Sequence, residues 1–217
     1  MSEVRQQILD RIRRANSEEP LSSYADLPRD YTRGGRRDRE ACAALMVERL
    51  REYDAEVVEC EPGDLTACIA DCLTRSSKRT FVAPPGLPAE WLVHGFSWKV
   101  DKDLTHSAIE ASDGVVTACF AAVADSGTIV LHHSPAEGRR VISLLPDRHL
   151  CVLNTSQIVE TLPEYFARCA EPPRLATYIS GPSATADIEM TRIKGVHGPR
   201  FLHVIVVHDE PIARGPS

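Results

Sequence analysis

The chain lacks an excess of positive charge. Its 31 acidic residues outnumber its 25 basic residues, which gives a net charge of -6 over 217 residues. This balance argues against a broad nucleic-acid-binding face, because such faces need clustered Lys and Arg. Charged residues make up 26% of the chain and hydrophobic residues 43%, so the composition favours a folded globular domain over a disordered chain.

Long apolar segments are also missing. The longest, Val115 to Ala124, has about half the length of a membrane-spanning helix and contains Thr117. The first 16 residues carry charges every few positions and have no apolar stretch, so they do not match a secretory signal. We therefore expect a soluble cytoplasmic protein without a membrane span.

The common metal and cofactor motifs are absent. The seven cysteines include no C-x2-C pair, and His94 and His106 have no acidic or thiol neighbour at ligand spacing. Reduced, mostly buried thiols are the simplest interpretation of the cysteines. Neither a G-x-G-x-x-G turn nor a G-K-[ST] loop occurs. We expect no metal and no bound cofactor in this chain.

The chain does contain a regular succession of helix and strand patterns. Val4, Ile8 and Ile12 form one helical stripe, and residues 16–37 have prolines and glycines without an apolar period. We expect three parts: residues 1–37 as an N-terminal helix and loose arm, residues 38–210 as a single domain, and residues 211–217 as a tail.

Within the central part, a helix capped by Asp38, a strand at 56–60, a helix from Asp64 to about Arg75 and a strand at 79–83 are expected. This α-β-α-β order predicts an α/β domain with a parallel sheet and covering helices. The later patterns are listed together: one strand or two short ones at 115–124, strands at 127–133, 149–154, 174–180 and 201–208, and a helix at 156–170 interrupted by Pro163.

Polar side chains concentrate at strand turns in the C-terminal half, where we expect the site. Residues 124–131, ADSGTIVL, place Asp125, Ser126, Gly127 and Thr128 in a tight turn. The turn is rich in hydrogen-bonding groups, and its glycine permits a ligand to approach the backbone. An ordinary hairpin turn is the alternative.

Histidine occurs in the next segment. Residues 143–153, SLLPDRHLCVL, place His149 at the start of a strand. A histidine there is either a general acid or base near neutral pH or a structural side chain with satisfied hydrogen bonds. The residue alone does not distinguish the two roles.

The third segment, YISGPSATADIE at 178–189, is the most informative. A strand ends, Gly181 turns the chain, and Ser183, Thr185 and Asp187 offer oxygens at alternate positions. A strand followed by a glycine turn and free backbone amides is how anion cradles are built. Simple helix capping is the alternative.

The fourth segment, KGVHGPRFLHV at 194–204, brackets His197 with glycines. Gly198 precedes Arg200, whose guanidinium is suited to hold a carboxylate or phosphate with two parallel hydrogen bonds. A rigid turn with a solvated arginine is the alternative.

Together and in this order, the four segments resemble the lactate-utilisation protein C family, whose shared domain is called the LUD domain. The resemblance covers roughly residues 38–208, and Ser126 stands where relatives often carry Thr, which retains the hydroxyl. It implies the fold of ribose-5-phosphate isomerases, CoA transferases and 5-formyltetrahydrofolate cyclo-ligases. That fold is α/β and three-layered, with a mixed, mostly parallel sheet and helices on both faces.

The resemblance also implies a function. Members act in bacteria with two companions to oxidise L-lactate to pyruvate, and a larger companion carries cysteines for iron–sulfur clusters. This chain lacks such a run, so it resembles the cluster-free member, with the clusters expected in a partner. The family assigns no chemistry to particular residues, so catalytic residues are unknown and His149 and His197 are candidates only. A small carboxylate or phosphate is expected near Asp125, Ser126, Gly127, Thr128, Gly181, Ser183, Thr185, Asp187, Gly198 and Arg200.

Two other functions remain open. One is a stand-alone enzyme on a small phosphorylated or acyl substrate, for which Glu137 is the glutamate near the motifs. An isolated loop glutamate is usually a surface charge, and fold analogy alone is weak support for a function. The other is a non-catalytic assembly protein that binds a carboxylate and uses the N-terminal arm to contact a partner.

Overall fold

The structure is a computed structural model that describes residues 3–15, 27–28, 30–171, 173–186, 192–194 and 198–209, with residues 184–186 and 192–194 described by their backbone. The chain divides into two compact units, Met1–Thr32 and Arg33–Ser217. Residues 33–37, which we expected in a loose arm, fall within the second unit.

The first unit contains α1 (Glu3–Ala15). The predicted helix is confirmed, and its apolar stripe faces solvent, with Val4, Ile8 and Ile12 being 63%, 54% and 51% exposed. No residue of α1 is buried. Its helical state therefore does not depend on packing within the described part of this unit.

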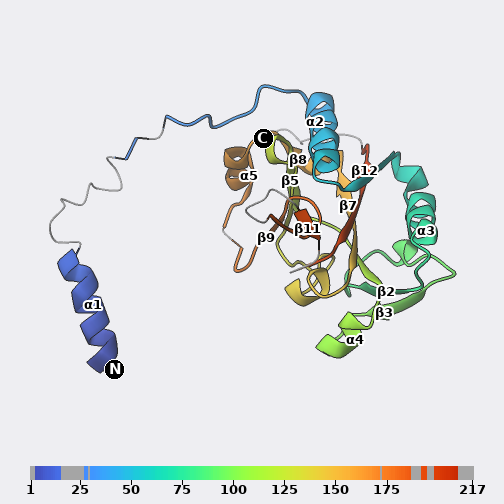
Figure 1. Ribbon diagram of the computed structural model, residues 1–217. Coiled ribbons are helices and arrows are strands. Elements are labelled where there is room, and N and C mark those ends of the chain that lie inside the picture. Colours follow the sequence, from blue (N-terminus) through green and yellow to red (C-terminus); the bar gives the residue numbers. More distant parts are fainter. Residues whose placement is uncertain are drawn as a thin grey trace. The chain divides into compact units, whose positions relative to one another are not determined.

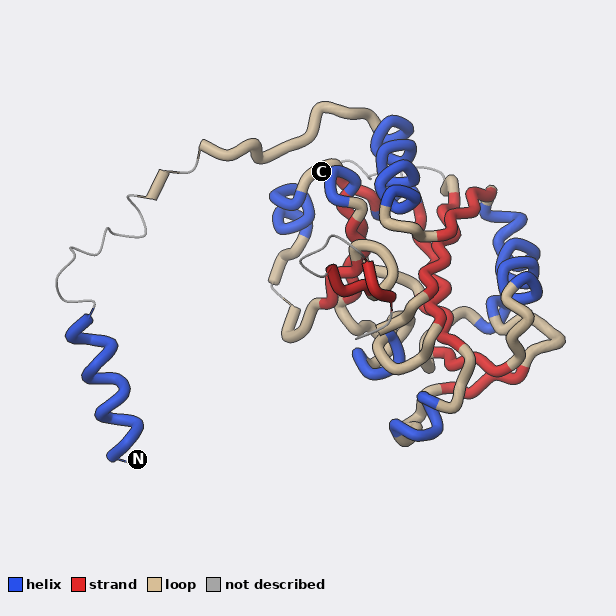
Figure 2. Tube along the Cα trace, in the orientation of Figure 1, coloured by secondary structure: helices blue, strands red, loops and turns tan. Residues whose placement is uncertain are grey.

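A six-stranded sheet forms the centre of the second unit (Figure 2). Its strand order is β1-β12-β7-β4-β2-β3, and every pairing is parallel. The strands are β1 (Glu56–Cys60), β2 (Thr80–Ala83), β3 (Ser97–Val100), β4 (Gly114–Thr117), β7 (Arg148–Asn154) and β12 (Phe201–Val207).

A smaller sheet has the order β8-β5-β6-β9. Its strands are β5 (Ala121–Val123), β6 (Thr128–Leu131), β8 (Ile158–Val159) and β9 (Thr177–Ile179). The β5–β8 pair is parallel, and the other two pairs are antiparallel. Residues 115–124 thus form two short strands in different sheets. In addition, β10 (Ala184–Ala186) pairs with β11 (Arg192–Lys194) in antiparallel fashion.

The helices of the second unit are α2 (Arg39–Glu52), α3 (Leu65–Arg75), α4 (His106–Glu110) and α5 (Leu162–Arg168). The 3-10 turns are η2 (Pro62–Asp64), η3 (Ala89–Trp91), η4 (Ala124–Ser126), η5 (Arg140–Ser143) and η6 (Thr155–Gln157). Asp38 caps α2 as predicted, with its Oδ1 accepting from the Ala41 N–H at 2.8 Å.

The predicted helix at 156–170 is wrong in its first half. Residues 158–159 pair with β5, and the helix begins at Leu162 behind a capping box formed by Thr161 and Glu164. Pro163 lies in the first turn, where the missing N–H costs no helical hydrogen bond. Proline therefore starts this helix instead of interrupting it.

Both faces of the main sheet are buried, which explains the continuous apolar runs of β7 and β12. Alternate residues of β12 face opposite layers: Val204 and Val206 pack with α2 and the smaller sheet, whereas Ile205 and Val207 pack with α3. Figure 1 shows α3 on one side of the main sheet and β5, β8, β9 and α5 on the other. The predicted α/β fold, with a mostly parallel sheet and helices on both faces, is confirmed.

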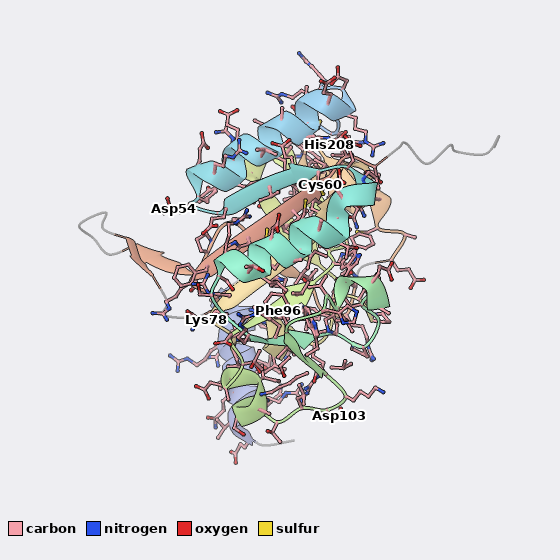
Figure 3. The ribbon with its side chains drawn as sticks, turned by 90° about the vertical axis from the view of Figure 1, so that its right-hand side faces the viewer. Asp54, Cys60, Lys78, Phe96, Asp103 and His208 are labelled. Carbon is pink, nitrogen blue, oxygen red and sulfur yellow. The ribbon has the colours of Figure 1, made fainter. Side chains whose placement is uncertain are left out.

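The two ends of the main sheet differ in what they carry. Figure 3 shows Cys60 and His208 together at the carboxyl ends of β1 and β12, with Asp54 at the opposite end of β1. The His208 N–H donates to the Cys60 carbonyl at 2.9 Å. The cysteines are free thiols, five of them buried, as predicted.

Residues 35–37 are held by the carboxylate of Glu160, which lies between β8 and α5. Glu160 Oε2 accepts the Arg36 and Arg37 N–H groups at 2.6 and 2.7 Å, and Oε1 accepts from Arg37 Nη1 at 2.6 Å. The Arg37 N–H, the Arg36 N–H and the Arg37 guanidinium together lower the pKa of Glu160. A Cβ on Gly35 would lie 2.2 Å from Glu160 Oε2, so only glycine permits this approach.

We expect Glu160→Gln to loosen this contact. The amide keeps the size of the side chain but sets an NH₂ group against N–H donors, which removes charge-assisted hydrogen bonds. Trypsin should then cleave after Arg36 and Arg37 several times faster, and the thermal midpoint should fall. Glu52→Gln is the matched control, because Glu52 pairs with Arg49 on exposed α2 surface. Equal cleavage rates in the two variants would contradict the assignment.

Candidate functional site

A cavity of about 170 Å³ lies between the two sheets, at the amino ends of β7 and β12. Its walls come from η5, from β9 and the turn after it, and from the turn before β12. Three of the four predicted segments contribute to it. The lining residues are Arg140, Ser143, Leu144, His149, Thr177, Tyr178, Ile179, Ser180, Gly181, Pro182, Ser183, Gly198, Pro199 and Leu202.

The glycine turns of the third and fourth segments meet in this wall. Gly181 has a φ of +85°, and a Cβ there would lie 2.6 Å from Tyr53 Cβ, so the position needs glycine. The Ser183 N–H donates to the Pro199 carbonyl at 2.8 Å and joins the two turns. This amide, which we expected to be available to an anion, is therefore already bonded.

Arg200 does not line the cavity. Its guanidinium donates through Nε and Nη2 to the two carboxylate oxygens of Asp147, the latter at 2.9 Å, and these bonds raise its pKa. The Phe201 N–H also donates to the Asp147 carbonyl, at 3.1 Å. Asp147 thus fastens the turn before β7 to the turn before β12, and it occupies the fork that we assigned to a ligand.

The first segment reaches the cavity only through hydroxyls. Thr128 Oγ1 lies 2.8 Å from both Ser126 Oγ and Ser180 Oγ, and Ser180 lines the cavity. Asp125 is exposed and lies 3.5 Å from Arg37, on another part of the surface. A Cβ on Gly127 would come within 2.7 Å of Arg49 Cβ, so Gly127 permits the approach of α2 and not of a ligand.

His149 lines the cavity as a neutral ring. Its side chain is fully buried, with Nε2 2.8 Å from Thr117 Oγ1, and burial lowers its pKa to about 4. A ring this weakly basic stays neutral at physiological pH and is a poor general base there. Its position favours a role in shaping and hydrogen-bonding the cavity. Asp187, His197 and the Thr185 side chain lie outside the described residues and stay predictions.

Two lining residues, Arg140 and Thr177, were not predicted from the sequence. Arg140 begins η5 and Thr177 belongs to β9, and Arg140 Nη1 donates to Thr177 Oγ1 at 2.5 Å. Arg140 stands in the charged loop EGRR, and nothing local separates it from Arg139. Arg139 is instead bound to buried Asp101, at 2.8 and 2.6 Å.

Glu137 in the same loop is not the surface charge that we expected. It is 3% exposed, and its oxygens accept from the His132 N–H and, at 2.7 Å, from Ser134 Oγ. A carboxylate occupied in this way stabilises the loop. It does not line the cavity, so nothing in the geometry favours it as a nucleophile.

A wider cleft of about 570 Å³ lies near the carboxyl ends of the main strands. Its arginines are already bonded: Arg37 to Glu160, Arg39 to Asp209, and Arg168 to the Ser156 and Ile158 carbonyls. The arginines of this cleft therefore have fewer hydrogen-bond donors left for an anion than Arg140 of the smaller cavity has. Among the described residues, no cluster of three His, Cys, Asp or Glu side chains suits a metal ion, and no helix is long and apolar enough to span a membrane.

The buried His149 predicts a pH dependence of stability. Its folded pKa of about 4 lies below the unfolded value near 6.5, so its contribution is complete above about pH 6.5 and is lost as the pH falls toward 4. The loss amounts to about 3 kcal/mol.

Urea unfolding between pH 4.5 and 7.5 measures this slope, and His149→Gln should flatten it. The exposed His94→Gln variant should keep the slope of the native chain. An imidazole resonance of His149 that titrates near pH 6.5 would contradict the assignment.

Comparison with known proteins agrees with the motif resemblance. The sequence pattern of the LUD domain matches residues 3–207. The chain is 40% identical over 164 residues to Lactate utilization protein C of Deinococcus radiodurans, covering 74% of this chain and 76% of the relative. It is 30% identical over 207 residues to Lactate utilization protein C of an Exiguobacterium species, covering 88% and 87%.

A solved structure supports the same conclusion. The crystal structure of a DUF162 family protein from Deinococcus radiodurans at 1.70 Å resolution superposes with a TM-score of 0.66 at 33% identity. The match covers 79% of this chain and 99% of that chain. A family pattern that extends over nearly the whole chain, together with relatives of this similarity, shows that the chain belongs to the LUD domain family of lactate-utilisation C proteins.

Proposed function

We propose that this protein is the cluster-free component of a bacterial system that oxidises L-lactate to pyruvate together with iron–sulfur partner proteins. The names of its relatives support a role in lactate utilisation. The observation that carries the proposal is the small cavity where three of the family's segments converge, and in whose described lining Arg140 is the single charged residue.

The reaction divides naturally between components. Oxidation of L-lactate to pyruvate releases two electrons and two protons, and the electrons need an acceptor. The sequence has no ferredoxin-like cysteine run, so in this proposal the clusters of a partner accept them. This chain contributes the carboxylate site and the contact with its partners, and the system acts in the cytoplasm.

A non-catalytic assembly protein is the second candidate. The exposed stripe of α1 favours it, because Val4, Ile8 and Ile12 offer an apolar face to another protein. The stand-alone acyl or phosphoryl enzyme has less support, because both Glu137 oxygens are used within their own loop.

The proposal predicts dependence on partners. A strain without this gene should grow on glucose but not on L-lactate, and the native gene should restore growth. The tagged chain, purified anaerobically from its own organism, should bring down iron-containing proteins. The colourless single chain should not reduce a dye with L-lactate, because in this proposal the redox centre that passes electrons from lactate to the dye belongs to a partner. Lactate-dependent dye reduction by the pure chain would contradict the division of roles.

Two variants separate the candidates. If the chain only assembles its partners, replacing Val4, Ile8 and Ile12 with serine abolishes lactate-dependent growth, whereas Arg140→Gln leaves it intact. If its carboxylate site takes part in the reaction, Arg140→Gln abolishes growth although the partners still co-purify.

A further inference from the structure

We propose that Arg140 is the anion-binding residue of the cavity at the amino ends of β7 and β12, and that its ligand is a small monocarboxylate with a neighbouring hydroxyl or keto group. This inference rests on the proposed function and names the ligand class and the residues that hold it. Arg140 takes the anion-binding role that the sequence suggested for Arg200, because the guanidinium of Arg200 is bound to Asp147.

Charge is the first support. Within the described lining, Arg140 is the only formally charged residue, and none of these residues is a carboxylate. His149 stays neutral because burial lowers its pKa to about 4. The described lining therefore carries a net positive charge, which favours a single negative group.

The guanidinium of Arg140 is the second support. Arg37, Arg139 and Arg200 each hold a carboxylate, at Glu160, Asp101 and Asp147 respectively. Arg140 donates one hydrogen bond to Thr177, and within the described residues its Nε and Nη2 groups have no protein acceptor. A planar fork with unused donors matches the two oxygens of a carboxylate.

A directed chain of hydrogen bonds positions this arginine. His133 Nδ1 lies 2.8 Å from the Gly138 carbonyl, and its Nε2 lies 2.8 Å from Thr177 Oγ1. Because a carbonyl only accepts, Nδ1 carries the proton, and in the neutral ring Nε2 accepts from the Thr177 hydroxyl. Thr177 Oγ1 is then free to accept from Arg140 Nη1. Thr177 and His133 are thus positioning residues.

Arg139 anchors the same loop from the other side. It binds both oxygens of Asp101, which is 5% exposed, and donates to the Leu104 carbonyl at 3.0 Å. The backbone of Arg140 is also held, because its carbonyl accepts from Ser143 Oγ at 3.0 Å. The site is therefore built before a ligand arrives, which reduces the entropy lost on binding.

Size and lining define the rest of the ligand. The cavity of about 170 Å³ is smaller than the ~300–1,000 Å³ typical for drug-sized ligands, which excludes nucleotides and CoA esters as enclosed ligands. Leu144, Ile179 and Leu202 offer an apolar wall, and the Ser180 and Ser183 hydroxyls offer polar groups. A phosphate dianion should bind weakly here, because the site offers it one guanidinium and the Ser183 amide already donates to the Pro199 carbonyl.

Isothermal titration calorimetry on the full chain at pH 7 tests the assignment, with L-lactate, pyruvate and inorganic phosphate as probes. Saturable binding of L-lactate and pyruvate, without phosphate binding, is expected. Arg140→Gln should weaken carboxylate binding about ten-fold or more. Arg51→Gln is the matched control and should leave the affinity within about two-fold, because Arg51 lies outside the lining and pairs with Glu59 on exposed surface.

The positioning chain has its own pair of variants. Thr177→Val removes the hydroxyl and should weaken carboxylate binding, whereas Thr177→Ser keeps it and should retain the native affinity. Thermal midpoints of both variants, together with that of Arg140→Gln, separate a loss of binding from a loss of folding.

Several results would overturn the inference. They are the absence of saturable carboxylate binding by the native chain, equal weakening by Arg140→Gln and Arg51→Gln, and preferential binding of phosphate. Failure of the wider proposal looks different. If the native chain binds L-lactate through Arg140 but deletion of its gene leaves growth on L-lactate unchanged, the site assignment stands and the proposed function fails. If growth requires the chain but Arg140→Gln binds normally, the function stands and this site assignment fails.

Discussion

Pairing of β12 with β7 organises both ends of the second unit. The last strand of the main sheet inserts between β1 and β7, in parallel register from Phe201 opposite Arg148 to Val207 opposite Asn154. Alternate residues of β12 are buried on opposite faces of the sheet. A slip of one residue would turn each side chain to the other face, so any shift of this register is energetically costly. The register brings the turn before β12 beside the turn before β7, and Asp209 beside Thr155 at the other end.

Ion pairs determine which arginines at each end of the main sheet remain available to a ligand. At the carboxyl ends, Glu160 pairs with Arg37 and Asp209 pairs with Arg39, so these two arginines of the wider cleft are already bonded to carboxylates. At the amino ends, Asp147 takes up Arg200, and Asp101 takes up Arg139. Arg140 is left facing the smaller cavity without a carboxylate in the described lining. An arginine in that state is suited to a ligand in a way that its paired neighbours are not.

The chemistry of the cavity favours binding over proton transfer at neutral pH. His149 is held neutral by burial, and its Nε2 is engaged with Thr117. The hydroxyls of Ser126, Thr128 and Ser180 form a connected network behind the wall, which fixes Ser180 as a hydrogen-bonding group. A rigid site with one cation and a neutral histidine suits the binding of a small anion better than proton transfer.

Local sequence was sufficient for many elements of this protein. The apolar runs of β1, β7 and β12, the Asp38 cap and the glycine turns at 181 and 198 were predicted, because strand propensity, capping and positive φ act over a few residues. Local patterns also identified the family. They failed at 156–170, where pairing of β8 with β5 overrode a helical pattern, and they did not detect β3, whose partner is β2.

Tertiary structure decided which charges are free. Arg140 and Arg200 look alike in the sequence, and Arg200 stood in the more distinctive motif. Asp147 is 53 positions before Arg200, and Asp101 is 38 positions before Arg139, so no local rule pairs them. The sequence by itself determined most of the elements, the glycine turns and the family. The folded sheet alone decided which arginine keeps its donors for a ligand, because that depends on contacts between residues far apart in the chain.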